Sequence, residues 1–157
     1  FAIRAAFPSL ADPWLFVVMR TMGIPSFIID ASERLCQDGV AIISLLGRRR
    51  NRIPVKSGIC QGCHAFGSLF VLARGPCFRY LTDNVGLPNG ILMGFADDIA
   101  GAVKDLLAAV PVVMRCFATI AGCSALELHP GKVIIVPLRK EEVEVLRKPI
   151  HRRLRGT

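Results

Sequence analysis

Apolar side chains recur along the chain with two different spacings, and the spacing predicts which segments are helical and which are extended. A return every three or four positions is typical of an amphipathic helix, whereas a short β-branched or aliphatic run is typical of a strand. Helices are predicted for residues 11–22, 27–37, 66–81, 106–121 and 140–146, and strands for residues 2–7, 40–46, 53–56, 91–96, 99–103 and 133–137. Helices mixed with closely spaced strands predict an α/β chain of the α+β type with an antiparallel sheet.

Glycine and proline residues mark the ends of several predicted elements. Gly23 ends the first long helix and Gly39 ends the second. Gly75 and Pro76 fall inside the helix predicted for residues 66–81, where the proline removes one backbone hydrogen bond and should kink the helix.

Two adjacent acids, Asp97 and Asp98, lie between the strands predicted for residues 91–96 and 99–103. A tight hairpin would therefore carry two carboxylates at its tip, among apolar side chains. Burying such charges costs on the order of several kcal/mol each unless a cation or a partner compensates them. Paired carboxylates can hold the divalent ions of two-metal phosphoryl transfer, but aspartate is also common in ordinary turns. The pair alone leaves both interpretations open.

The composition is richer in core-forming residues than that of an average soluble domain. Apolar residues make up 52% of the 157 positions and charged residues 20%, where about 45–50% and about 25% are usual. We therefore expect a piece of a longer protein whose other parts cover some of this surface. The chain opens at Phe1 without a secretory signal, so we expect an intracellular protein, nuclear or cytoplasmic and not secreted. The longest uncharged stretch, residues 57–73, is too polar to span a bilayer, and we predict no membrane partner.

Positive charge is concentrated in two places. Lys and Arg number 20 against 12 Asp and Glu, which gives a net charge of +8. One cluster lies in the loop predicted between two strands and comprises Arg48, Arg49, Arg50 and Arg52; the other is the tail from residue 147 to 155. Such clusters attract phosphate backbones through counterion release, although a solvated loop and tail would look the same. We expect one domain over residues 1–138 and a basic C-terminal extension over residues 139–157.

Four short motifs follow one another along the chain. Residues 5–9 read AAFPS, residues 57–63 read SGICQGC with Leu69 and Phe70 further on, residues 95–98 read FADD, and residues 126–132 read LELHPGK. In this order they resemble the motifs of non-LTR (LINE-type) retrotransposon reverse transcriptases, whose first motif is DxxxAF. The later family motifs read SGxxQGCPLSPLLF, FADD or YADD, and LxLNxxK. The resemblance covers nearly the whole chain.

The resemblance implies a right-hand polymerase palm, in which an antiparallel sheet with a catalytic hairpin is backed by helices. It implies an RNA-directed DNA polymerase, in which a primer 3′-hydroxyl attacks the α-phosphate of a deoxynucleotide with the help of two Mg²⁺ ions. The implied partners are an RNA template, a DNA primer, deoxynucleotides, and the rest of a parent polyprotein that supplies fingers, thumb and an endonuclease.

The catalytic roles carry over by position. Asp97 would be the bridging metal ligand and Asp98 its neighbour, while Lys132 would meet the pyrophosphate as a charge stabiliser or proton donor. The family's first motif has an aspartate where this chain has Ala2, so the backbone carbonyl of Ile3 would be the ligand that remains there. We therefore expect severely impaired activity. The alternative is a catalytically dead palm that only binds nucleic acid.

The substrate-binding roles carry over in the same way. Phe7 would lie under the sugar and exclude a ribose 2′-hydroxyl, and Gln61 would bond in the nucleotide pocket. Gly58 and Gly62 would let the backbone approach template and nucleotide closely, because no side chain intervenes. Each also has a purely structural interpretation, as a core ring or a loop glycine.

A different kind of site is compatible with the cysteines. Cys60, Cys63 and His64 spell the CxxCH pattern of haem attachment, and with His129 or a methionine they could be drawn as a haem or zinc site. Haem attachment of this kind occurs in exported proteins, and zinc would need further ligands at finger-like spacing. His64 and His129 also depart from the family motifs. The simpler account assigns both cysteines to the SGICQGC motif, and we expect reduced, mostly buried thiols.

Overall fold

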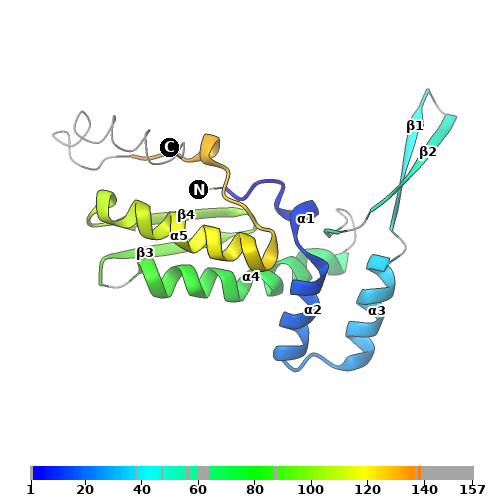
Figure 1. Cartoon of the computed structure of the whole chain (residues 1–157), viewed down its shortest axis with the longest axis horizontal. Coiled ribbons are helices and arrows are strands. Elements are labelled where there is room, and N and C mark those ends of the chain that lie inside the picture. The colour runs from blue at the N-terminus through cyan, green and yellow to red at the C-terminus, as the bar shows by residue number, and fades with distance from the viewer. Residues whose placement is uncertain are drawn as a thin grey trace. The chain divides into compact units, whose positions relative to one another are not determined.

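The computed structural model describes residues 2–37, 39–46, 48–55, 57–59, 64–86, 88–136 and 138. Over these residues the chain combines helices with two small antiparallel hairpins, so the predicted α+β class is confirmed (Figure 1). The chain divides into two compact units, which are described separately. Unit 1 comprises Phe1–Ala6 and Gly75–Thr157, and unit 2 comprises Phe7–Arg74. The predicted boundary between residues 138 and 139 falls where the description ends, and it stays a prediction.

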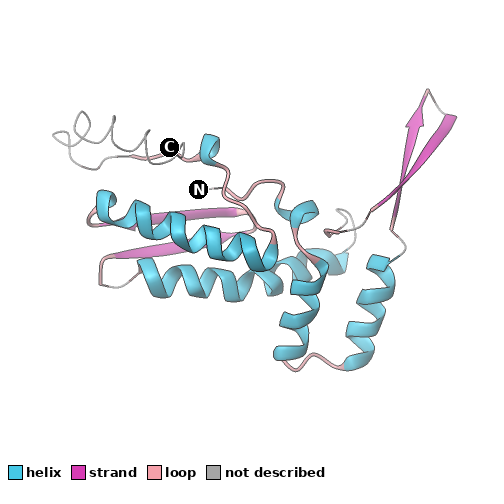
Figure 2. Cartoon of the chain, in the orientation of Figure 1, coloured by secondary structure: helices cyan, strands magenta, loops and turns pink. Residues whose placement is uncertain are grey.

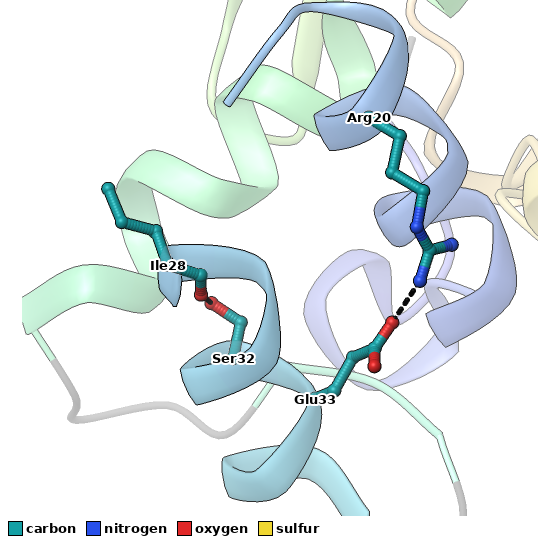
Figure 3. A network of polar contacts seen from close by, with 4 residues as sticks. All are labelled: Arg20, Ile28, Ser32 and Glu33. Carbon is teal, nitrogen blue, oxygen red and sulfur yellow. Dashed lines mark hydrogen bonds and ion pairs between the residues drawn. The ribbon is translucent and has the colours of Figure 1, made fainter. Parts of the chain in front are cut away.

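In unit 2 the helices α2 (Asp12–Thr21) and α3 (Ser26–Gln37) confirm the helices predicted for residues 11–22 and 27–37. Proline is accepted in the first turn of α2 because that amide would lack an intrahelical partner in any case. The two helices pack as neighbours and are joined by an ion pair between Arg20 and Glu33 (Figure 3). Ser32, in the same view, donates to the carbonyl of Ile28 one turn earlier, at 2.8 Å.

A hairpin of β1 (Val40–Leu45) and β2 (Arg48–Pro54) follows in unit 2, as Figure 2 shows. The pairing of the two predicted strands is confirmed, but the arginine-rich segment predicted as their loop is itself part of β2. Backbone pairing to β1 can include any residue whose amide and carbonyl face the neighbouring strand, so the polarity of the arginines does not exclude them. The register shifts between Ile42 and Ser44, which marks a β-bulge.

The helix α4 (His64–Val85) runs from unit 2 into unit 1 and is longer than the predicted helix 66–81. The helix continues through Pro76. In unit 2 its residues Phe70 and Ala73 are fully buried, and the Trp14 indole donates to the Ala73 carbonyl at 2.9 Å. This bond ties α2 to α4.

In unit 1 the strands β3 (Gly90–Phe95) and β4 (Asp98–Val103) form the hairpin predicted from the two apolar runs. Two residues connect them, and Asp98 itself is the first residue of β4, paired with Phe95. The positive φ of 47° at Ala96 is a turn conformation that residues other than glycine rarely adopt. At the open end, the Lys104 amide donates to the Asn89 carbonyl at 2.8 Å.

The first residues of the chain join this hairpin as an isolated bridge and do not form the predicted strand 2–7. Ala2 and Ile3 make bridges to β4 and to Leu128, and the helix α1 (Ala6–Ser9) begins soon after. Ala5 has a positive φ of 43°, which takes the chain out of the extended conformation before the predicted strand could be completed.

The helix α5 (Leu106–Ser124) confirms the helix predicted for residues 106–121. The Asp105 side chain caps its first turn by accepting from the Ala108 amide at 3.0 Å. One face is buried, with Val110, Val113, Cys116, Phe117 and Ile120 each at most 5% exposed. Among the described residues, α5 is the one helix long and apolar enough to cross a membrane by length and composition alone. A core helix with a buried face meets the same criteria.

After α5 the chain turns at Ala125 and reaches a short 3₁₀ helix, η1 (Pro130–Lys132). The strand predicted for residues 133–137 is wrong for the described residues 133–136, which form no strand. Their aliphatic side chains favour an extended chain, but a strand also needs a neighbour to pair with, and Ile134 and Val136 are mostly exposed. The helix predicted for residues 140–146 lies outside the described residues.

Candidate active site

The acid pair of unit 1 lies beside Ala2, the position at which the resemblance predicts an aspartate. Ala2 and Asp98 form an antiparallel bridge, and the Ile3 amide donates to the Asp97 carbonyl at 3.1 Å. This bond flanks the bridge, so Ala2 and Asp98 are a non-hydrogen-bonded pair, in which Cα atoms lie about 4.5 Å apart and side chains are neighbours. A longer side chain at position 2 would therefore lie next to the Asp98 carboxylate.

The last motif continues this ladder on the other side of Ala2. Ile3 bridges to Leu128, and the His129 amide donates to the Ala2 carbonyl at 2.9 Å. Residues that pair across such a ladder share a face, so Asp98, Ala2 and His129 form one row. The neighbouring positions point to the opposite face, where Ile3 is 5% exposed.

The two carboxylates differ in exposure, because Asp97 lies in the turn and is half-buried, whereas Asp98 at the start of β4 is exposed. Within the part of the chain that the structure describes, no group of three or more His, Cys, Asp or Glu side chains could hold a metal ion. Ala2, opposite Asp98 in the ladder, contributes a methyl group and no ligand oxygen from its side chain. Two carboxylates suit an oxygen-preferring cation such as Mg²⁺, but they are an incomplete set for a pair of ions.

The predicted catalytic lysine lies directly after this row. Lys132 is exposed at the end of η1, whose turn is closed by the bond from its amide to the His129 carbonyl at 3.0 Å. The His129 ring lies against Gly131, where a Cβ would approach its Cε1 to 3.2 Å. His129 Nδ1 is buried and has no hydrogen-bond partner among the described residues.

The predicted substrate residues belong to unit 2, where Phe7 and Gly58 lie on the same corner. The Phe7 ring stacks on Phe70 with centroids 4.4 Å apart, and its carbonyl accepts from the Ile59 amide at 2.8 Å. Gly58 has a φ of 92°, and a Cβ there would lie 2.3 Å from the Pro8 carbonyl oxygen. The glycine is therefore required by a contact within the chain itself. Gln61 and Gly62 lie outside the described residues, as do Cys60, Cys63 and the side chain of His64.

Asp12 belongs to none of the four motifs, yet its side chain contacts this corner. Its carboxylate accepts from the Gly58 amide at 3.1 Å. Desolvation raises the pKa of Asp12 above its usual value, and the bond from Gly58 lowers it to a lesser extent. The sequence shows Asp12 as an acid at the start of a helix. It does not show that the partner of this acid is the distant Gly58 amide.

The predicted nucleic-acid residues lie on β2 of unit 2. Arg48 pairs with Leu45 and Arg52 with Ile42, and both arginine side chains are exposed. Four residues apart on a regular strand they would share a face. Their partners on β1, Leu45 and Ile42, are only three residues apart and therefore point to opposite faces. Because paired residues share a face, the bulge places Arg48 and Arg52 on opposite faces as well. Arg49 and Arg50 also belong to β2 by their backbone, and their side chains lie outside the description.

No protein-family model matches the chain. No curated protein matches it either.

Proposed function

We propose that the chain is the palm of an RNA-directed DNA polymerase of the non-LTR reverse transcriptase type, with a metal site that lacks one of its acids. The single observation that carries the proposal is the bridge between Ala2 and Asp98. Two motifs far apart in the sequence meet at the one pair of positions where a polymerase of this type needs neighbouring carboxylates. The fourth motif adjoins the same row through His129.

The proposed reaction is attack of a primer 3′-hydroxyl on the α-phosphate of a deoxynucleotide. Asp97 and Asp98 would hold Mg²⁺, with the Ile3 carbonyl as a further oxygen ligand, and two bound ions would stabilise the attacking and leaving oxygens. Ala2 removes the charge that would join the two ions. Each 1.36 kcal/mol of lost transition-state stabilisation lowers the rate about tenfold, so the chain as written should be severely impaired.

The remaining roles in the proposal follow the motifs. Lys132 neutralises the developing charge on the pyrophosphate, and Phe7 selects against a ribose 2′-hydroxyl. Gln61 and Gly62 contact the incoming nucleotide. The partners are an RNA template, a DNA primer and deoxynucleotides, and the palm works inside a longer intracellular polyprotein that contributes fingers, thumb and an endonuclease.

Primer extension on an RNA template tests the proposal. The parent protein carrying Ala2→Asp should extend a DNA primer with deoxynucleotides in Mg²⁺, and the additional change Asp97→Asn should abolish extension. The isosteric Ala2→Asn is the matched control, since it adds a similar volume without the charge. A parent protein that makes no DNA with Asp at position 2 would overturn the polymerase assignment.

A second candidate is a palm that retains nucleic-acid binding alone. It is favoured by Ala2 at the metal site and by the exposed Arg48 and Arg52 on β2. Sequence-independent binding should weaken steeply with salt, and Arg52→Ser should reduce the slope of log affinity against log salt by about one. Arg20→Ser is the control, because this exposed arginine already pairs with Glu33. Robust extension by the unmodified chain would contradict this candidate.

A further inference from the structure

The corner of unit 2 that holds Gly58 is built from three contacts around one short segment. Gly58 is pressed against the Pro8 carbonyl, where no Cβ fits. The Ile59 amide donates to Phe7, and the Ile59 side chain is 2% exposed. The Gly58 amide donates to the Asp12 carboxylate. Of these contacts, the one with Asp12 is the one made by a charged side chain.

We propose that Asp12 is a positioning residue, which fixes the Gly58 amide against the start of α2, three positions before Gln61 and four before Gly62 in the sequence. The functional half of this inference rests on the proposed function, which places those two residues at the incoming nucleotide. Asp12 does not touch the nucleotide. It acts through Gly58, three positions before Gln61 in the sequence.

The ordinary structural role of an acid in this position would be to cap its own helix. An aspartate in the first turn can stabilise a helix through the helix dipole and bonds to the first amides. The Asp12 Oδ1 instead accepts from an amide 46 residues away, at 3.1 Å. Desolvation also raises the pKa of Asp12, so the carboxylate is held partly away from water at this contact. These observations point to an anchor for the 57–59 segment.

The consequence of losing Asp12 follows from the positive-φ backbone of Gly58 that it holds. Gly58 has a φ of 92°, a conformation that glycine tolerates but does not require. Without an acceptor at Asp12, the amide would have to turn toward water, and Gly58 could leave the Pro8 carbonyl. The neighbouring bond from Ile59 to Phe7 would loosen with it. We expect a shift in nucleotide binding, while the acid pair in unit 1 is left as it is.

Amide hydrogen exchange tests the positioning itself in the unmodified chain and in three variants. The Gly58 amide should be protected in the unmodified chain, and Asp12→Ala should speed its exchange about tenfold, the size expected for losing one hydrogen bond to a charged acceptor. Asp12→Asn keeps an oxygen acceptor and should preserve the protection. Asp30→Ala removes an exposed acid from α3 of the same unit and should change nothing.

Primer extension by the parent protein with Ala2→Asp tests the functional half. There Asp12→Ala should raise the KM for the deoxynucleotide about tenfold with kcat within about twofold, and Asp12→Asn should restore the KM. An unprotected Gly58 amide in the unmodified chain, or equal protection with Ala and Asp at position 12, overturns the positioning role whatever the protein's activity. An unchanged KM in an active parent overturns the link to the nucleotide. If Asp12→Ala removes the protection of the Gly58 amide but no variant of the parent protein extends a primer, the proposed function and the link to the nucleotide are contradicted. The role of Asp12 in holding Gly58 would still stand.

Discussion

Ala2 lies directly opposite Asp98 in an antiparallel bridge, so the position that lacks an acid faces an acid that the chain retains. Ala2 is buried, with 8% of the residue exposed. Its neighbour across the bridge is an exposed carboxylate. A carboxylate added at position 2 would therefore bring two negative charges to adjacent positions of one row.

We expect Ala2→Asp to lower stability in the absence of metal and to make stability depend on Mg²⁺. The two carboxylates repel each other until a cation lies between them, and an ion that binds only the folded chain adds about 2.7 kcal/mol at a hundredfold excess over its Kd. Thermal unfolding with and without Mg²⁺ measures the effect. Ala102→Asp places an acid on the same strand, away from Asp98, and equal Mg²⁺ stabilisation of both variants would contradict the prediction.

Gly58→Ala should destabilise the chain by at least about 2 kcal/mol, because a Cβ adds both an unfavourable φ and a clash with backbone. The clash is with the Pro8 carbonyl oxygen, 2.3 Å from the Cβ position. Gly67→Ala is the matched control, since a Cβ at Gly67 in α4 meets nothing within 4 Å. That change should raise stability by about 0.5–1 kcal/mol through helix propensity. Urea unfolding measures the stability of both variants. A loss well below about 2 kcal/mol for Gly58→Ala would show that residues 57–59 can move away from the Pro8 carbonyl.

Ala96→Gly should stabilise the β3–β4 hairpin by about 0.5–1 kcal/mol, because glycine adopts a positive φ without the cost that a Cβ imposes. The φ of Ala96 is 47°. The comparison is Ala100→Gly in the middle of β4, where the same change should destabilise the chain by a similar amount. Chemical denaturation of the two variants measures whether each change raises or lowers the free energy of unfolding. Destabilisation by both changes would mean that the turn does not require this backbone conformation.

Asp12→Asn should flatten the pH dependence of stability. Desolvation raises the pKa of Asp12 in the folded chain above 3.8, the ordinary value that applies to the unfolded chain. At a pH between the unfolded pKa and the folded pKa, the folded chain therefore binds more protons than the unfolded chain. Stability from this group is then greatest below pH 3.8 and is lost as the pH rises through the folded pKa. Relative to Asp12→Asn, the unmodified chain should lose stability over that window. Unfolding at several pH values measures the difference, and a gain in relative stability with rising pH would contradict the sign.

Ser124→Ala should lower stability by about 1–3 kcal/mol, because it removes a buried hydroxyl that bonds on both sides. Ser124 is fully buried, donates to the Ile120 carbonyl at 2.7 Å and accepts from the Leu126 amide at 3.3 Å. Thr119→Ala on the same helix removes an exposed hydroxyl with a similar bond to Arg115 and should change stability by less than about 0.5 kcal/mol. Equal losses in thermal unfolding would mean that the loop after α5 does not depend on Ser124.

The sequence by itself determined the long helices, the β3–β4 hairpin and the place of the acid pair. Apolar spacing predicted α2, α3 and α5, and two short apolar runs predicted the β3–β4 hairpin with Asp97 in its turn. These features depend on contacts between residues close together in the chain, where helix and strand periods differ and turn residues are distinctive.

The tertiary structure alone decided which distant residues meet. The bridge of Ala2 to Asp98 and the inclusion of Arg48 in a strand rest on backbone groups of both partners. The bond from Gly58 to Asp12 has a backbone amide as its donor. Every residue except proline carries the same amide and carbonyl, so a backbone contact between distant segments leaves no pattern of side chains to read. The motifs named Ala2, Asp98 and Gly58, and only the fold placed Ala2 beside Asp98 and Asp12 beside Gly58.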